Sequence, residues 1–477
     1  MGDIGDPTFQ PSTRATLPVA NPTKSFWQTS HPNELVNERT TPGLPETADV
    51  VIVGSGVTAA FAARELFKQN PKLNVVVLEA RTTCSGATGR NGGHCQPIIH
   101  EATPDVIDFE LQNFREIEKL ISDNNIQCDW RRLKGCMAFW NKTYFEESKE
   151  ELEHQRKTDP RHLKLVKVVE SNWGLAAWRL KHSAGAIEQS TAATLSPYKL
   201  VIWLWANMLK EYSLNLQTTT PVSAIERVKD GYSCHTERGV VHAKNILLAT
   251  NGYTSHLLPD FEKLIRPVQG QMSALEVPES FSDQILTHSY GFMGTGKKDR
   301  VMSDYLHQRP TVPGGYLNMG GGGHLMFGGA RECVAGLGEG VSDDSYVDPD
   351  AEDYLTKLPQ YLDLTSGDKD GIVVSKDTTL SLAASWTGIM GYSVDHIPWV
   401  GGVPQLEGLW LCGGYTGHGM TNAAGCAQHV ARLIAASIDG KDWHDVQARA
   451  VEQCEIPKQY ILTQDRVDRQ FANAAKA

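Results

Sequence analysis

The chain has 477 residues, 40% of them hydrophobic and 21% charged, so it can bury a large core, and two domains are expected. Its formal net charge of −11 argues against a nucleic-acid partner. No apolar run approaches the roughly 20 residues of a membrane span, so we expect no membrane partner.

Residues 1–47 are rich in proline, threonine, serine and asparagine and predict an irregular arm without repeats. The first residues, MGDIGDPTFQPSTRA, lack the basic and apolar stretches of a secretory signal. The nine cysteines form no CxxC pair, and no HExxH motif occurs in the chain. These features favour free thiols in a reducing compartment, a cytoplasmic location and no metal site.

The first informative pattern is a strand followed by a glycine turn and a helix. The apolar run 50–53 is typical of a strand buried in a parallel sheet. Gly54 and Gly56 follow at once, and Ala59 stands in place of a third glycine, which suits a tight turn and close approach to a diphosphate. The helix predicted over 57–69 would direct its N-terminal N–H groups at that diphosphate.

A second strand, predicted over 74–78, ends at Glu79, where a carboxylate can accept hydrogen bonds from ribose hydroxyls and disfavours NADP. In isolation, the glycines could form an ordinary turn and Glu79 could be a surface acid. The order strand, glycine turn, helix, strand, acid favours a dinucleotide site. This pattern alone leaves NAD and FAD open.

A second glycine-rich loop, SGATGRNGG at residues 85–93, follows soon after Glu79 and favours a flavin over a nicotinamide. Farther along the chain, the spacing of apolar and charged residues predicts several elements. These are helices over 103–125, 146–164, 198–212 and 350–362, and a buried strand over 244–250.

A second strand, glycine loop and helix lie near the end of the chain. The run 409–412 predicts a strand, residues 413–420 read GGYTGHGM, and closely spaced alanines predict a helix over 421–437. The N-terminus of such a helix stabilises negative charge, as on the O2/N1 edge of a reduced flavin. The alternative for this loop is a purely structural turn.

Together these motifs resemble the D-amino-acid oxidase-like family of FAD-dependent oxidoreductases, and its γ-glutamylputrescine oxidase-like members in particular. The similar segments follow one another in the same order over about residues 48–435. They are the first glycine turn, SGATGRNGG, LLATNGY, RPVQGQ, DHIPWVGG and GGYTGHGM. An arm with Ser25, Phe26 and Trp27 precedes them. The motifs are specific for the family and say little about the substrate.

The resemblance implies an α/β fold. A Rossmann-type, glutathione-reductase-like FAD-binding domain would be interleaved with an α+β substrate domain on a mixed or antiparallel sheet. The implied ranges are 1–47 for the arm, 48–100, 213–265 and 375–440 for the FAD-binding domain, 101–212 and 266–374 for the substrate domain, and 441–477 for a C-terminal extension.

The resemblance also implies which residues contact FAD. The first loop would hold the diphosphate and adenosine, the second loop the ribityl chain and ring, and the last loop the pyrimidine edge of the ring. The implied cofactor-binding residues are Gly54, Ser55, Gly56, Thr58, Glu79, Ala80, Arg81, Gly86, Ala87, Thr88, Arg90, Asn91, Gly92, Gly93, Val222, Thr250, Gly252, Gly414, Gly417, His418, Gly419 and Met420.

Some relatives attach FAD covalently to a cysteine just before the terminal Asp-Pro segment, but here Trp386 is followed by Thr-Gly-Ile-Met. Others attach it to a histidine early in the second loop, where this chain has Arg90. We therefore predict non-covalent FAD. His94 and Cys95, a few residues beyond the loop, are the positions for a covalent alternative.

The reaction implied by the resemblance is oxidation of a C–N bond in a small amine or amino acid. Hydride would pass to flavin N5, the imine would be hydrolysed, and oxygen would reoxidise the flavin and give hydrogen peroxide. The candidate catalytic residues are His94, His418 and Tyr415. The alternatives are a flavin dehydrogenase with another electron acceptor, an NAD-dependent dehydrogenase and an inactive flavin-binding protein.

Two arginines are candidates for binding a substrate carboxylate, Arg309 and Arg331. For each of them, a surface salt bridge is the expected alternative. Tyr305 is a further candidate for lining the substrate pocket.

Overall fold

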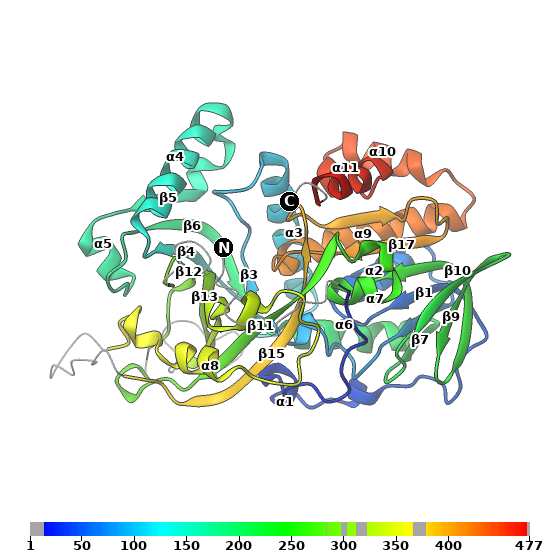
Figure 1. Ribbon diagram of the computed structural model, residues 1–477, viewed down its shortest axis with the longest axis horizontal. Helices are drawn as coiled ribbons and strands as arrows, with labels where there is room; N and C mark the ends of the chain where they lie inside the picture. Colours follow the sequence, from blue (N-terminus) through cyan, green and yellow to red (C-terminus); the bar gives the residue numbers. More distant parts are fainter. Residues whose placement is uncertain (1–13, 283, 297–302, 312–321, 366–377, 475–477) are drawn as a thin grey trace.

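The computed structural model describes residues 14–474 except 283, 297–302, 312–321 and 366–377. The described residues form two large sheets, one of eight strands and one of nine, which lie side by side with helices around them (Figure 1). The chain passes between the sheets several times, so each sheet combines segments that are far apart in sequence. This arrangement confirms the predicted α/β fold with two interleaved units.

The eight-stranded sheet is parallel at its centre, where β7, β2, β1, β10 and β17 are neighbours. Strand β16 and the hairpin of β8 and β9 add antiparallel edges. The last four residues of β1 are buried, as expected for a strand covered on both faces. The bounds are Thr47–Val53 (β1), Val75–Leu78 (β2), Leu214–Gln217 (β7), Ala224–Val228 (β8), Gly231–Thr236 (β9), Gly239–Leu248 (β10), Trp399–Gly402 (β16) and Leu409–Gly413 (β17).

Helices α2 (Val57–Gln69) and α9 (Gly419–Ile438) pack against each other and contact strands of this sheet. Both carry fully buried alanines, including Ala59 on α2 and Ala423 on α9, whose small side chains permit close packing. Each helix begins just after a glycine loop that follows a strand. Their N-termini therefore lie at the carboxyl edge of the parallel sheet. Helices α6 (Pro197–Glu211) and α3 (Pro104–Asp123) contact α2 and α9, respectively.

The nine-stranded sheet is mixed. Strand β12 runs parallel to β4, and all other strand pairs of this sheet are antiparallel. Its longest pairing joins β11 to β15. The bounds are His94–Cys95 (β3), Arg131–Phe139 (β4), Val166–Val169 (β5), Gly185–Thr194 (β6), Ile265–Leu275 (β11), His288–Met293 (β12), Ser303–Pro310 (β13), Gly322–Gly329 (β14) and Leu382–Ser393 (β15).

Prolines shorten two of the helices predicted from sequence. The charged helix α4 spans Lys142–Thr158 rather than 146–164, because Asp159 precedes Pro160 and has extended backbone angles. Helix α8 spans Pro349–Thr356 rather than 350–362, and a short 3₁₀ helix, Leu358–Gln360, follows it. The predicted helices over 57–69 and 198–212 are confirmed to within one residue at each end.

The predicted domain ranges stay a prediction. Strands β3 and β15 fall within the ranges 48–100 and 375–440 assigned to FAD binding, and their hydrogen-bonded partners, β6 and β11, belong to the nine-stranded sheet. The remaining helices are α1 (Phe26–Thr29), α5 (Asn172–Ala177), α7 (Thr254–Leu257), α10 (Trp443–Glu452) and α11 (Gln464–Ala474). Within the described ranges, no helix has the length and apolarity needed to cross a membrane.

Candidate cofactor and active site

A cavity of about 510 Å³ lies where the carboxyl ends of the parallel strands face the nine-stranded sheet. This edge is where α/β sheets commonly bind ligands. Most of the predicted cofactor-binding residues line it: Gly54, Ser55, Gly56, Thr58, Glu79, Ala80, Arg81, Gly86, Ala87, Thr88, Arg90, Asn91, Gly92, Val222, Thr250, Gly417, His418, Gly419 and Met420. All three predicted catalytic residues, His94, His418 and Tyr415, line it as well.

The turn after β1 can only be made by glycine. Gly54 has a φ of +103°, and a Cβ at this position would lie 2.8 Å from the carbonyl oxygen of Ala249. This close approach lets the chain turn directly from β1 into α2. The first residues of α2, Val57 and Thr58, consequently reach the cavity wall.

The carboxylate of Glu79 is bonded to the same turn. It accepts hydrogen bonds from the Ser55 N–H (3.0 Å), the Ser55 hydroxyl (2.6 Å) and the Arg81 N–H (2.9 Å). The Ser55 hydroxyl in turn accepts a bond from the Cys84 N–H at 2.8 Å. Glu79 is therefore fixed at the cavity wall, and these bonds also join the first glycine turn to the start of the second loop.

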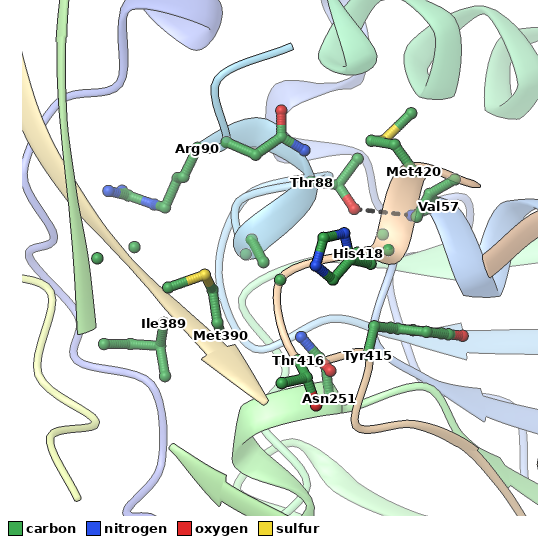
Figure 2. Close-up of a pocket in the computed structure, with 18 of the residues that line it drawn as sticks. Val57, Thr88, Arg90, Asn251, Ile389, Met390, Tyr415, Thr416, His418 and Met420 are labelled. Atoms are coloured by element: carbon green, nitrogen blue, oxygen red, sulfur yellow. Dashed lines mark hydrogen bonds between the residues drawn. The ribbon is translucent and has the colours of Figure 1, made fainter. Parts of the chain in front are cut away.

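The second glycine loop contacts the start of α2 through Thr88. The Val57 N–H donates to the Thr88 hydroxyl at 3.0 Å, as Figure 2 shows. Gly86 has an ordinary φ of −80°, and a Cβ at this position would meet open space. Since Gly86 lines the cavity, this loop leaves room there for a ligand.

The loop before α9 forms the facing part of the wall. Figure 2 shows Tyr415, Thr416, His418 and Met420 around the same cavity as Thr88 and Val57. The Tyr415 hydroxyl lies 2.9 Å from the Thr58 hydroxyl and 3.2 Å from the Cys412 sulfur. Burial raises the pKa of this hydroxyl well above its ordinary value. Tyr415, just before α9, is thus linked to Thr58 in the first turn of α2.

Two histidines at the cavity are held in the neutral form. Burial lowers the pKa of His94 to about 3, and the Ser289 hydroxyl lies 2.6 Å from His94 Nδ1. His94 Nε2 is buried and has no hydrogen-bond partner among the described residues. Burial also lowers the pKa of His418, and the nearby Glu101 carboxylate opposes this shift. Neutral imidazoles can donate or accept one hydrogen bond to a bound molecule.

Arg81 and Arg90 share a buried carboxylate that sequence reasoning missed. Asp344 lies 2.8 Å from Arg81 Nη1 and 3.4 Å from Arg90 Nε. Arg90 also donates to the carbonyls of Thr387 and Thr23, both at 2.7 Å. Burial lowers the pKa of Arg90 to about 10, so its guanidinium stays charged at neutral pH. Asp344 comes from a segment with no motif, so only the fold reveals this pairing.

Three predicted cofactor-binding residues do not line the cavity: Gly93, Gly252 and Gly414. Each lies against other protein atoms. A Cβ on Gly93 would lie 2.4 Å from the Leu195 carbonyl, and one on Gly252 would lie 2.5 Å from the Met390 carbonyl. These two glycines allow close packing behind the wall.

Sequence reasoning missed many of the lining residues, including some from the following three places. Asn251 and Tyr253 follow β10, Ile389 and Met390 belong to β15, and residues 16–18 come from the N-terminal arm. The Asn-Gly pair at the end of a predicted strand was a usable signal for Asn251. Of the two candidate arginines, Arg331 lines the cavity. Arg309 does not, and instead bonds to Asp129 at 3.3 Å.

The residues present fit FAD. Two helix N-termini face one cavity, which suits a diphosphate at one and an electron-rich ring edge at the other. The open space at Gly86 and the fixed carboxylate of Glu79 provide room and a ribose acceptor between them. The described residues contain no group of three or more histidine, cysteine or carboxylate side chains placed to hold a metal ion.

The family model described as FAD-dependent oxidoreductase (DAO) matches residues 49–433 of this chain. A glycine oxidase of Pseudomonas aeruginosa is 24% identical over 405 residues, which cover 82% of this chain and 95% of the relative. The gamma-glutamylputrescine oxidoreductase of Escherichia coli is 24% identical over 419 residues, which cover 83% of this chain and 84% of the relative.

Among solved structures, the glycine oxidase from Geobacillus kaustophilus is similar in fold, with a TM-score of 0.65 and 18% sequence identity. The match covers 88% of this chain and 99% of that structure. It extends over both sheets, so the two interleaved units match together.

Proposed function

The chain belongs to the DAO family of FAD-dependent oxidoreductases, and on this premise we propose that it oxidises a C–N bond of a small amine or amino acid. FAD, when bound, supplies the acceptor for a hydride from the carbon next to nitrogen and passes the electrons to oxygen, with release of hydrogen peroxide. The oxidised substrate is an imine, which water hydrolyses. The names of the two relatives, an amino-acid oxidase and an amine oxidoreductase, support this substrate class.

The observation that carries the proposal is the wall contributed by the nine-stranded sheet. Its lining is largely apolar or aromatic and includes Met137, Tyr290, Met293 and Tyr305, and burial there keeps His94 neutral. The same desolvation favours the neutral form of an entering amine over the ammonium form. Only the neutral amine has the free lone pair that assists hydride loss. No protein base is then needed to start the reaction.

Among the three candidate catalytic residues, the contacts favour the histidines. His94 has a buried ring nitrogen that has no partner in the described part of the chain, so it has capacity for a bond to the substrate or the cofactor. His418 lies at the start of α9 on the same cavity. The Tyr415 hydroxyl already contacts Thr58 and Cys412, so we assign it a positioning role.

Arg331 is the better placed partner for a substrate carboxylate. It lines the cavity, and its guanidinium donates to the Leu337 carbonyl at 3.2 Å and to Glu339 at 3.4 Å. The contact with Glu339 is long for a charged pair, so the guanidinium keeps capacity for a further anion. Arg309, in contrast, contacts Asp129 and the rings of Phe26 and Trp27.

A panel of secondary amines, amino acids and γ-glutamylated polyamines tests the proposal. We expect at least one of them to bleach the flavin absorbance without oxygen and to release hydrogen peroxide when oxygen is admitted. Bleaching without release of peroxide would mean that the electrons pass to an acceptor other than oxygen. A flavin that stays oxidised with every compound would contradict amine oxidation and favour an inactive flavin-binding protein.

We propose that FAD is bound without a covalent link. Cys95 is buried with its sulfur 3.9 Å from the Met420 carbonyl and is absent from the cavity lining, and Arg90 cannot form such a link. Acid precipitation should therefore leave the protein colourless and the flavin in the supernatant. Yellow precipitate would instead indicate attachment, with His94 as the candidate because its ring reaches the cavity.

A further inference from the structure

Part of the cavity lining comes from residues that precede the segment matched by the family model. Thr16, Leu17 and Pro18 of the N-terminal arm line the cavity, together with His256 and Leu257. The family model begins only at residue 49. The arm is thus an addition to the two sheets, and it lies next to Arg81, a lining residue that bonds to both Val19 of the arm and Glu79.

The arm is bonded to the body of the protein at this end. The Ala15 N–H donates to the Ser255 hydroxyl at 2.9 Å, and the Thr16 N–H donates to the Ser342 hydroxyl at 3.2 Å. The Val19 carbonyl accepts a longer bond, 3.4 Å, from Arg81. Because these bonds use the backbone of the arm, they fix its path along the cavity rather than the position of a single side chain.

The middle of the arm is bonded to the second glycine loop by Arg90. The guanidinium donates to the Thr23 carbonyl at 2.7 Å and to the Thr23 hydroxyl at 3.2 Å. The Thr23 N–H donates to the Asp344 carbonyl at 2.7 Å. Most N–H groups of Arg90, a predicted cofactor residue, therefore bond to protein atoms. Some of these atoms belong to Thr23 of the arm.

The end of the arm reaches the flavin side of the same loop, where five consecutive carbonyls each accept a hydrogen bond. The donors come from four separate segments of the chain, and the arm supplies two of them. They are the Ser25 hydroxyl to Gly89 (2.5 Å), the Trp386 indole to Arg90 (2.7 Å), the Trp27 indole to Asn91 (2.6 Å), the His307 ring to Gly92 (2.6 Å) and the Leu195 N–H to Gly93 (3.0 Å).

These bonds direct the loop carbonyls into the protein, away from the cavity. Asn91 and Gly92 nevertheless line the cavity, and no acceptor for their N–H groups is found among the described residues. A peptide whose carbonyl points into the protein directs its N–H the opposite way. The loop thus presents backbone donors to the ligand, and two of the five bonds that hold it come from the arm.

We propose that the N-terminal arm is part of the cofactor-binding site. Residues 16–18 cover the adenosine end of FAD, and Ser25 and Trp27 are positioning residues for the loop that binds the flavin. This inference concerns retention of the cofactor and is independent of which substrate is oxidised. It also supplies a physical basis for tight binding without a covalent link, because the arm would have to move for FAD to leave on the side that residues 16–18 cover.

The variant Trp27→Phe tests the positioning role, since it removes the indole N–H and keeps a buried aromatic ring. We expect FAD to dissociate about three- to tenfold faster from the holoprotein, as the loss of one hydrogen bond to a loop carbonyl predicts. Trp140→Phe is the matched control, because the Trp140 indole also donates to a carbonyl, that of Lys181 at 3.0 Å, but Lys181, unlike Asn91, is not among the residues that line the cavity. The rate is measured from the return of free-flavin fluorescence after dilution.

A spectroscopic readout separates positioning from a general loss of stability. The visible circular dichroism of bound flavin should change in Trp27→Phe and stay unchanged in Trp140→Phe. Ser25→Ala provides an independent variant that removes the other arm donor. Ser282→Ala is its control, because the Ser282 hydroxyl also donates to a carbonyl, that of Glu279 at 2.9 Å, outside the cavity lining. Equal dissociation rates and identical spectra for variants and controls would overturn the proposal.

Limited trypsin digestion tests the covering role. Lys24 is exposed in the arm, directly before the buried Ser25. If the arm closes over bound FAD, cleavage after Lys24 should be slower in the holoprotein than in the apoprotein. Cleavage at the same rate with and without FAD would show that the arm does not respond to the cofactor, and would contradict the covering role.

Discussion

The hydroxyl of Ser55 donates a hydrogen bond of 2.6 Å to the carboxylate of Glu79. Ser55 follows β1 and Glu79 follows β2, so this bond joins the carboxyl ends of two neighbouring parallel strands. The same carboxylate accepts the N–H groups of Ser55 and Arg81. Glu79 therefore shapes the glycine turn in addition to presenting an acceptor to the ribose.

Replacing Glu79 should weaken FAD binding. In Glu79→Ala the Ser55 hydroxyl and two backbone N–H groups lose their acceptor, and hydrogen bonds to a charged group are worth about 1.5–3 kcal/mol. We expect the Kd for FAD to rise about 10- to 100-fold, and less in Glu79→Gln, which keeps an acceptor oxygen. Titration of the apoprotein by quenching of flavin fluorescence measures this. Glu226→Ala, on an exposed strand, should bind like the unaltered chain.

Two glycines at the cavity should respond differently to alanine. Gly54→Ala places a Cβ 2.8 Å from the Ala249 carbonyl in the left-handed region, which costs about 1–2 kcal/mol for the backbone alone. We expect a lower Tm even without FAD. Gly86→Ala meets open space at the cavity, so the Tm of the apoprotein should stay the same while FAD affinity falls. A lower apoprotein Tm in Gly86→Ala, or an unchanged Tm in Gly54→Ala, would contradict this assignment.

Burial of His94 should make the fold less stable in acid. Because the pKa of His94 falls from 6.5 to about 3 on folding, only the unfolded chain binds a proton there between these values. Burial of His94 therefore does not reduce the free energy of unfolding above pH 6.5. Below pH 6.5 it reduces this free energy progressively as the pH falls toward 3. His94→Gln should reduce the slope of unfolding free energy below pH 6.5 by about 1.4 kcal/mol per pH unit.

Urea denaturation at a series of pH values measures this slope. His154→Gln, on the exposed part of α4, is the control and should leave the slope unaltered. An unchanged slope in His94→Gln would mean that the ring is not kept neutral by the fold. Activity should likewise show no inflection that depends on His94 near neutral pH.

Arg331 should separate carboxylated from uncarboxylated substrates. If its guanidinium binds a substrate carboxylate, Arg331→Met should raise KM for amino acids about 10- to 100-fold and leave KM for simple amines nearly unchanged. Arg266→Met is the matched control, because Arg266 lies 3.8 Å from the same carboxylate, Glu339, but does not line the cavity. An equal rise in KM for both substrate classes would contradict a role of Arg331 in binding the substrate carboxylate.

The local parts of the site could be predicted from the sequence. One short stretch of sequence contains the turn at Gly54, helix α2 and the acid at Glu79. The residue types that give these parts their roles can therefore be read from a local pattern. The loop before α9 repeats the same pattern, so it was found by the same reasoning. Family resemblance then joined the two units into one expected site.

The rest of the site depends on pairing over long distances. Strand β15 contributes Ile389 and Met390 to the cavity only because it pairs with β11, and no local pattern specifies that register. Asp344 and Thr23 of the arm contact Arg81 and Arg90, and such partners do not follow from the spacing of residues in the sequence. Neutral His94 likewise required the burial that the fold provides.

The order of strands in the parallel sheet has a consequence for biosynthesis. Strand β10 lies between β1, from the start of the chain, and β17, from near its end. The loops that follow these three strands all reach the cofactor cavity. The complete pocket can form only after β17 and the loop before α9 have been synthesised, so we expect FAD uptake to follow that step.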